Sequence, residues 1–176
     1  DFTINAIALD PSALGGSASG GKGQIVDPYK GQIDLKDKIV RTVGDPDVRF
    51  NEDALRLLRA VRIMAELGFA LDSECAASIA KNASNLGHIS RERVRDELSR
   101  ILLSNEPMMA LAICQKLGLL SHIAKDLTRG VGIEQNQAHS YDVFEHLLRT
   151  TQHAADKKFN FDIRLAALFH DVSKPE

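Results

Sequence analysis

The feature that most constrains the fold is an amphipathic helical pattern over residues 48–67. Apolar side chains recur there every three or four residues, the spacing of one helix face: Ala54, Leu57, Leu58, Val61, Met64 and Ala65. The opposite face carries one carboxylate and three guanidiniums: Asp53, Arg56, Arg59 and Arg62. Gly68 follows, and glycine commonly ends a helix. We therefore expect one continuous helix with a buried apolar side and a polar side made mostly of arginines.

The polar side of this helix has the chemistry of a nucleotide-binding surface. Arginine forks donate paired hydrogen bonds to phosphates and base edges, and a carboxylate accepts a hydrogen bond from an amino group. Such a row of donors and acceptors favours a helix that reads a nucleotide. The alternative is a solvated face held by local ion pairs, which amphipathic helices commonly have.

Helical patterns continue along the rest of the chain. Capping residues or proline mark their starts, at Asp72 or Ser73, at Ser90 and at Pro107. We predict helices over residues 73–82, 91–104, 107–118, 119–125, 141–156 and 162–171. The chain is therefore expected to be mainly α-helical.

Residues 1–47 have a different pattern, with short apolar runs between turn residues. In chain order we predict a helical turn at 3–5 capped by Asp1, strands at 6–9, 24–27 and 39–43, and an irregular stretch at 33–38. The first two strands are expected to pair as a hairpin.

The connector of this hairpin, residues 15–23, is rich in glycine and serine and contains Lys22. It is close to a phosphate-binding loop, but such a loop needs Ser or Thr after the lysine and then a helix. Gly23 and a predicted strand follow instead. A flexible hairpin tip is therefore the better interpretation.

Charge and cysteine content limit the class of protein. Charged residues make up 26% of the chain, yet the net charge is only −2, so nucleic-acid contacts must come from local arginine clusters, at 49–62 and 91–100. Two cysteines, Cys75 and Cys114, form no disulfide framework. No apolar run reaches the ~20 residues of a membrane span. We expect a cytoplasmic protein without membrane contact.

A second group of chemically active side chains lies near the end of the chain. His146 falls on one predicted helix, and His170 and Asp171 end the next. Two imidazoles and a carboxylate brought together by helix packing form a plausible divalent metal site. The spacing of His139, His146 and His153, seven residues apart, is also that of one exposed helix side, and most histidines bind no metal.

Several motifs together resemble one family, the bacterial-type class II tRNA nucleotidyltransferases, or CCA-adding enzymes, and their poly(A) polymerase relatives. Asp1-Phe-Thr-Ile-Asn-Ala6 is similar to the end of that family's Arg-Arg-Asp-Phe-Thr-x-Asn-Ala motif. Four more stretches match in order: Ile25–Gly31 continuing to Arg41, Glu52-Asp-Ala-Leu-Arg56 as Glu-Asp-x-x-Arg, Ser90–Leu98, and His146 with Leu165–Pro175 as an HD domain.

The resemblance implies a three-part chain. Residues 1–47 would be a hairpin remnant of a nucleotidyltransferase head, residues 48–127 a helical neck and body that binds nucleotide and RNA, and residues 128–176 the start of an HD domain. The head's catalytic part would lie upstream, so the chain is expected to be a fragment of a longer enzyme.

The resemblance also implies roles for the polar row. Asp53 would accept from the exocyclic amino group of CTP or ATP, and Arg56 would donate to ring acceptors; uracil and guanine present a different pattern. Arg59 and Arg62 would meet the triphosphate, and Asp1 and Asn5 would lie near the ribose. The RNA partner would be the 3′ end of tRNA.

Nucleotidyl transfer in this family is a two-metal reaction, with Mg²⁺ held by an Asp-x-Asp motif. Asp45-Pro-Asp47 has that spacing but lies on the neck joint, so we expect the metal ligands outside this chain and no activity from the chain alone. His146, His170 and Asp171 would form a partial HD site, because HD sites take a further aspartate downstream. Such domains hydrolyse phosphoesters or contact tRNA.

Three functional hypotheses therefore stand. The first is the neck and body of a tRNA nucleotidyltransferase or poly(A) polymerase. The second is an HD-type metal-dependent phosphohydrolase with a regulatory front half, and the third is an RNA-binding helical adaptor without a nucleotide pocket. Addition of CCA, of A, of CC or of poly(A) would use the same base-reading pair.

Overall fold

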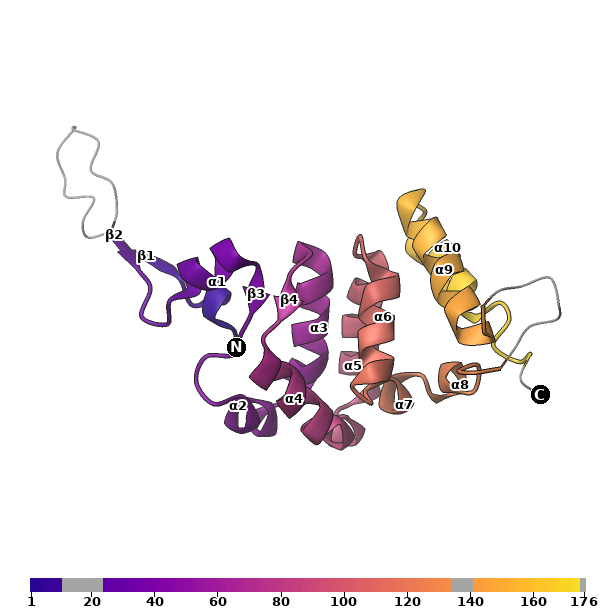
Figure 1. Cartoon of the computed structure of the whole chain (residues 1–176), viewed down its shortest axis with the longest axis horizontal. Helices are drawn as coiled ribbons and strands as arrows, with labels where there is room; N and C mark the ends of the chain where they lie inside the picture. Colours follow the sequence, from indigo (N-terminus) through magenta and orange to yellow (C-terminus); the bar gives the residue numbers. More distant parts are fainter. Residues whose placement is uncertain (11–23, 134–140, 175–176) are drawn as a thin grey trace.

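Helices make up most of the molecule, as the periodicity predicted. The computed structural model describes residues 1–10, 24–133 and 141–174. The described elements follow one another along an elongated body, from the hairpin at one end to the pair α9 and α10 at the other (Figure 1). The fold class predicted from the sequence, mainly α with a small hairpin, is confirmed.

The predicted hairpin is present, with shorter strands. Strand β1 (Ala8–Asp10) pairs antiparallel with β2 (Gln24–Val26), and Leu9 lies opposite Ile25. The glycine- and serine-rich connector, for which we predicted a flexible tip, lies outside the described residues. The helical turn η1 (Thr3–Asn5) precedes β1. Its N-cap is Phe2, so the expectation that Asp1 caps it is wrong. The Asp1 carboxylate instead forms ion pairs with Arg56 and Arg59.

The stretch predicted to be irregular is instead helix α1 (Gly31–Asp37). The Asp27 carboxylate accepts hydrogen bonds from the Gly31 and Gln32 N–H groups, at 2.7 and 2.9 Å, and so satisfies the free donors at the helix start. Gly31 packs against the backbone of η1, where a Cβ would lie 2.3 Å from the Thr3 carbonyl oxygen. The cap stands four residues before the helix, and the helix has no clear apolar stripe, so the sequence pattern missed it.

A parallel pair of short strands joins the first part of the chain to the helices. Strand β3 (Ile39–Val40) pairs with β4 (Ala70–Leu71), and the Ala70 and Asp72 N–H groups donate to the Lys38 and Val40 carbonyls at 2.8 and 3.0 Å. β3 was predicted as part of a longer strand. β4 was not predicted, because two residues are too few to show an alternation.

The helix expected over residues 48–67 is two helices, which corrects the prediction of one continuous helix. Helix α2 (Pro46–Glu52) and helix α3 (Leu55–Leu67) are separated at Asp53, whose backbone is extended at φ −153° and ψ 104°. The Asp53 carboxylate accepts from the Leu55 N–H at 3.1 Å. Aspartate competes for backbone donors in this way at helix starts, and here that competition breaks the helix.

The remaining α-helices agree with the predicted positions within a few residues, except that the one expected at 119–125 is two short helices, and the 3₁₀ helix η3 was not predicted. They are α4 (Ser73–Asn82), the 3₁₀ helix η3 (Ala83–His88), α5 (Arg91–Leu103), α6 (Pro107–Lys116), α7 (Leu120–Ile123), α8 (Lys125–Thr128), α9 (Val143–Asp156) and α10 (Phe161–Phe169).

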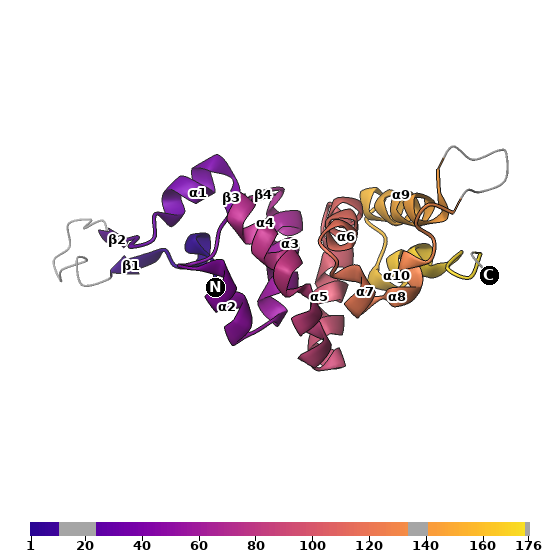
Figure 2. The same cartoon turned by 60° about the horizontal axis from the view of Figure 1, so that its bottom comes forward.

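The apolar face of α3 is buried, as predicted, from Ala54 to Ala65. α3 packs against α5 and α6, α6 packs against α9, and α9 packs against α10, so that the core runs through successive layers (Figure 2). None of the described helices is both long and apolar enough to cross a lipid bilayer.

Candidate functional site

A chain of alternating charges connects the first residue to helices α3 and α5. Arg56 Nε lies 2.7 Å from Asp1 Oδ1, and Arg59 Nη1 pairs with the other Asp1 oxygen. Glu97 of α5 is the next charge in the row, and its carboxylate lies 3.5 Å from Arg59 Nε and 2.6 Å from Arg62 Nε. Asp1 therefore lies against α3 because two arginines one helical turn apart point at its carboxylate.

Asp53 lies beside this row of alternating charges, between α2 and α3. Arg93 of α5 donates to Asp53 Oδ2 at 2.7 Å, while the Leu55 N–H is bonded to Oδ1. The side chain is 26% exposed, so a ligand can reach the carboxylate. Burial raises the pKa of Asp53, but the hydrogen bonds from Arg93 and Leu55 and the charges of Arg93 and Arg56 outweigh it and hold the pKa below its ordinary value. Asp53 is therefore an ionised acceptor at neutral pH.

Arg56 is fixed from several directions. Its Nη1 donates to the Arg49 carbonyl at 2.8 Å and to Glu52 Oε2 at 2.5 Å, and its Nε faces Asp1. The side chain is 17% exposed. Glu52 is thus a positioning residue for Arg56, and the pKa of Glu52 is lowered mainly by that hydrogen bond.

The other predicted site residues lie in different environments. The Arg62 side chain is only 7% exposed and forms ion pairs with Glu97 and with Glu66, at 2.6 Å each, so it points into the protein. Arg59 is 31% exposed and remains accessible beside Asp1. Asn5 is exposed at the end of η1, on the same turn of chain as Asp1. The structure brings Asp1, Asp53, Arg56 and Arg59 together, and it does not bring Arg62 to the surface.

Sequence reasoning missed two residues that position this group, Arg93 and Glu97. Glu97 is buried, and its signal was present in the sequence, because it shares the helical spacing of the apolar stripe Val94, Leu98 and Ile101. A carboxylate on an apolar stripe requires a partner, which here is a pair of arginines. Arg93 carried no such signal, because its contact crosses to a residue forty positions away.

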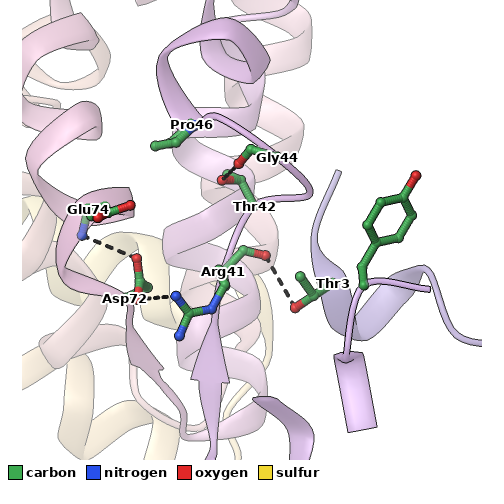
Figure 3. Close-up of a pocket in the computed structure, with 8 residues that line it drawn as sticks. Thr3, Arg41, Thr42, Gly44, Pro46, Asp72 and Glu74 are labelled. Atoms are coloured by element: carbon green, nitrogen blue, oxygen red, sulfur yellow. Dashed lines mark hydrogen bonds and ion pairs between the residues drawn. The ribbon is translucent and has the colours of Figure 1, made fainter. Parts of the chain in front are cut away.

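A cavity of about 200 Å³ lies where the first part of the chain meets the helices (Figure 3). Arg41 crosses it, with Nη1 2.9 Å from Asp72 Oδ1 and Nε 3.2 Å from the buried Asp34. Asp34 in turn accepts from the Thr3 hydroxyl at 2.7 Å. Arg41 thus bridges two carboxylates, and these contacts tie η1 to the end of β3 and to the start of α4.

The predicted metal group is assembled by α9 and α10. His146 Nε2 lies 3.1 Å from His170 Nε2, and these nitrogens lie 3.5 and 3.2 Å from Asp171 Oδ2. One ligand atom from each residue fits within 4.8 Å, which is compatible with a single divalent ion. Lys174 contributes a fourth group, with Nζ 2.6 Å from the same Asp171 oxygen.

Comparisons with known proteins identify relatives of this chain. A family model described as the probable RNA and SrmB-binding site of polymerase A matches residues 68–130. The chain is 41% identical over 123 residues to a CCA-adding enzyme of Geobacillus sp. (strain WCH70), covering 70% of this chain and 28% of that relative. It is 35% identical over 182 residues to an A-adding tRNA nucleotidyltransferase of Deinococcus radiodurans, covering 99% of this chain and 39% of that relative.

The fold is shared as well. The crystal structure of the Bacillus stearothermophilus CCA-adding enzyme in complex with CTP superposes with a TM-score of 0.65 and 30% identity, over 100% of this chain and 46% of that one. The chain spans less than half the length of each of these proteins. Because both the sequence and the fold match over nearly all of its length, the chain belongs to the family of tRNA nucleotidyltransferases that includes the CCA-adding enzymes.

Proposed function

We propose that this chain carries the nucleotide-selecting part of a template-independent RNA nucleotidyltransferase, an enzyme that adds CMP and AMP to tRNA 3′ ends from CTP and ATP. The observation that carries the proposal is the pair Asp53 and Arg56, a fixed ionised acceptor beside a fixed donor, both partly exposed. Cytosine and adenine each present an amino donor next to a ring-nitrogen acceptor, which this pair complements.

The neighbouring residues take supporting roles. Arg59 is exposed enough to meet a phosphate, while Arg62 acts through Glu97 as a positioning residue and does not contact the triphosphate. Asp1 and Asn5 would face the ribose side of the nucleotide. The division of the chain at residues 47 and 127 into head, body and HD parts stays part of the proposal, as does a cytoplasmic location, which suits the two buried thiols of Cys75 and Cys114.

The catalytic Mg²⁺ ions would be held outside this chain. The residues with the right spacing, Asp45 and Asp47, do not fit, because both are already engaged in the fold. Asp45 caps α2 by accepting from the Val48 N–H at 3.1 Å, and Asp47 accepts from Lys81 at 2.5 Å and from Asn82 at 2.9 Å. We therefore expect the isolated chain to bind and discriminate nucleotides without transferring them.

Nucleotide selectivity tests this proposal. Affinities for CTP, ATP, UTP and GTP are measured by calorimetry on the chain and on its Asp53→Asn variant. An asparagine can donate to the uracil O4, so the preference for CTP over UTP should fall by about tenfold or more. Asp45→Asn is the matched control, since it changes the aspartate that caps the preceding helix α2. Unchanged base preference in Asp53→Asn would remove the proposal in favour of a helical RNA-binding adaptor.

The same measurement separates the activities of the family. Comparable binding of CTP and ATP supports CCA addition. Binding of ATP alone supports A addition or poly(A) synthesis, and binding of CTP alone supports CC addition.

A second function, divalent metal binding with phosphoester hydrolysis of the HD type, is supported by the group His146, His170 and Asp171. Metal content after equilibration with Mn²⁺ should be about one ion per chain and should be lost in His170→Ala. His153→Ala, an exposed histidine on the same helix as His146, should keep the metal. Equal retention of Mn²⁺ by wild type and His170→Ala would contradict a metal site here.

A further inference from the structure

Arg49 of helix α2 reaches Arg56 by two routes. Its backbone carbonyl accepts from Arg56 Nη1 at 2.8 Å. Its guanidinium donates from Nη1 to Glu52 Oε2 at 2.7 Å, and the same Glu52 oxygen accepts from Arg56 Nη1 at 2.5 Å. Arg49 Nε is buried without a hydrogen-bond partner among the residues that the structure describes, so the shared carboxylate is what orients the Arg49 guanidinium.

The contacts of Arg56 leave one of its nitrogens for a ligand. Nη1 is used by the Arg49 carbonyl and by Glu52, and Nε faces Asp1. Nη2 donates a hydrogen bond to no described residue. Because a guanidinium is planar and rigid, the groups that hold Nη1 and Nε also set the direction in which the Nη2 N–H groups point.

Helix α2 is itself anchored, so it can serve as a fixed support for Arg56. It lies beside α4 at one end of α3 (Figure 1). Phe50 is fully buried in the core, and Asp47 accepts from Lys81 at 2.5 Å and from Asn82 at 2.9 Å, both on α4. Arg49 therefore meets Arg56 and Glu52 from a position that the fold determines.

From these contacts we propose that Arg49 is a positioning residue for base selection, which orients Arg56 through the shared carboxylate of Glu52 and through its own carbonyl. The role in selection rests on the proposed function, in which Arg56 reads the base. Glu52 is 44% exposed, and within the described residues its only cationic partners are these two arginines. Without the Arg49 guanidinium, Glu52 is free to turn toward solvent and no longer holds Arg56 in one direction.

This arrangement affects selectivity more than affinity. A donor held in one direction matches the ring-nitrogen acceptor of cytosine and leaves the different edge of uracil poorly paired. A donor that can turn reaches the carbonyl oxygens of uracil as well. Specificity is a difference between two affinities, so a mobile Arg56 reduces it even where both nucleotides still bind.

The restraint on Arg56 is tested without nucleotide. Nuclear magnetic resonance of arginine side chains reports rotation about the Cζ–Nη bonds, which is slow in a held guanidinium. In Arg49→Gln the rotation in Arg56 should be about threefold to tenfold faster, the effect of losing one hydrogen bond. Arg49→Lys keeps a cation beside Glu52 and should restore most of the wild-type rate. The matched control Arg149→Gln, which removes an arginine paired with Glu145 on α9, should not change it.

A double-mutant cycle tests whether Arg49 acts through Glu52. Binding of CTP and of UTP is measured by calorimetry on Arg49→Gln, on Glu52→Gln and on the double variant. Arg49→Gln should reduce the preference for CTP over UTP by about threefold to tenfold, and it should add little once Glu52→Gln is present. Additive effects would overturn the proposal, because Arg49 would then contact the nucleotide itself. An equal reduction in Arg149→Gln would overturn it as well.

The Asp53→Asn variant separates this inference from the proposed function. Lost selectivity in Asp53→Asn together with wild-type selectivity in Arg49→Gln would overturn this inference alone, as would an unchanged rotation rate of Arg56. Unchanged selectivity in Asp53→Asn would overturn the proposed function, and with it a role of Arg49 in selection.

Discussion

Asp53 shows how a single residue combines a structural and a recognition role. One carboxylate oxygen begins α3 by accepting from Leu55, and the other is held by Arg93. Each oxygen has a second lone pair, so a base amino group can bind without displacing Arg93. The sequence predicted Asp53 and Arg56 as a pair, but not that Asp53 would leave the helix. Helical spacing also gave the face on which Arg62 lies and not the neighbours that cover it, Glu97 and Glu66.

At this scale we predict that Arg93 controls the pH dependence of nucleotide binding. The folded pKa of Asp53 is lowered, so affinity that requires the carboxylate is present above that pKa and is lost as pH falls through it. In Arg93→Ala the pKa rises toward the ordinary value, so CTP affinity should be lost at a higher pH. Arg93→Lys should restore most of the wild-type profile.

Calorimetric titrations with CTP at pH values from 3 to 7 check this expectation. That range includes the ordinary aspartate pKa of about 3.9. Arg95→Ala, an exposed arginine that pairs with Asp96 on the same helix, is the control and should not move the profile. Superimposable profiles for Arg93→Ala and wild type would show that Arg93 does not act through Asp53.

At the scale of elements, the helices and strands with the longest sequence patterns were the ones predicted correctly. Helices such as α4 and α9 have caps and several turns of apolar spacing, and they lie where the sequence placed them. The short elements were missed or merged. α1 begins through a side chain four residues upstream, and β4 exists only because β3 lies beside it. Their stabilising contacts are tertiary, and a local pattern carries no record of them.

The break between α2 and α3 is the most instructive error among the elements. The apolar spacing continues across it, so periodicity alone predicted one helix. Two aspartates, Asp45 and Asp53, each bind backbone donors ahead of them, and each begins a separate helix. Capping chemistry therefore overrode the apolar period, and it did so at the residue to which we assign base recognition.

At the scale of the whole molecule, the layers are joined by a few buried polar contacts. Arg164 of α10 is buried and donates to the Leu102 and Ser104 carbonyls, at 2.8 and 2.9 Å. Those carbonyls belong to the end of α5, where free acceptors and the helix dipole favour a cation. The arginine therefore fastens the layer of α9 and α10 to the layer of α5 and α6. Its burial was not evident from the sequence, because an arginine side chain usually lies at the surface.

We predict that Arg164→Met lowers the free energy of unfolding by about 2–4 kcal/mol, because it leaves buried carbonyls without donors. Urea denaturation followed by circular dichroism measures the change. Arg149→Met removes an exposed arginine of α9 that pairs with Glu145, and it should cost less than about 1 kcal/mol. Similar losses in the two variants would show that Arg164 contributes no more than a surface pair.

The alternating charges along α3 and α5 also limit how such a sequence can change. From Arg59 through Glu97, Arg62 and Glu66 to Arg100, each side chain has a neighbour of opposite sign, so a change at one position leaves the next with an unmatched charge. Substitutions there are tolerated in compensating sets rather than singly. These positions should therefore covary among homologues. The residue that reads the base would then be oriented by a group of side chains that change together in evolution.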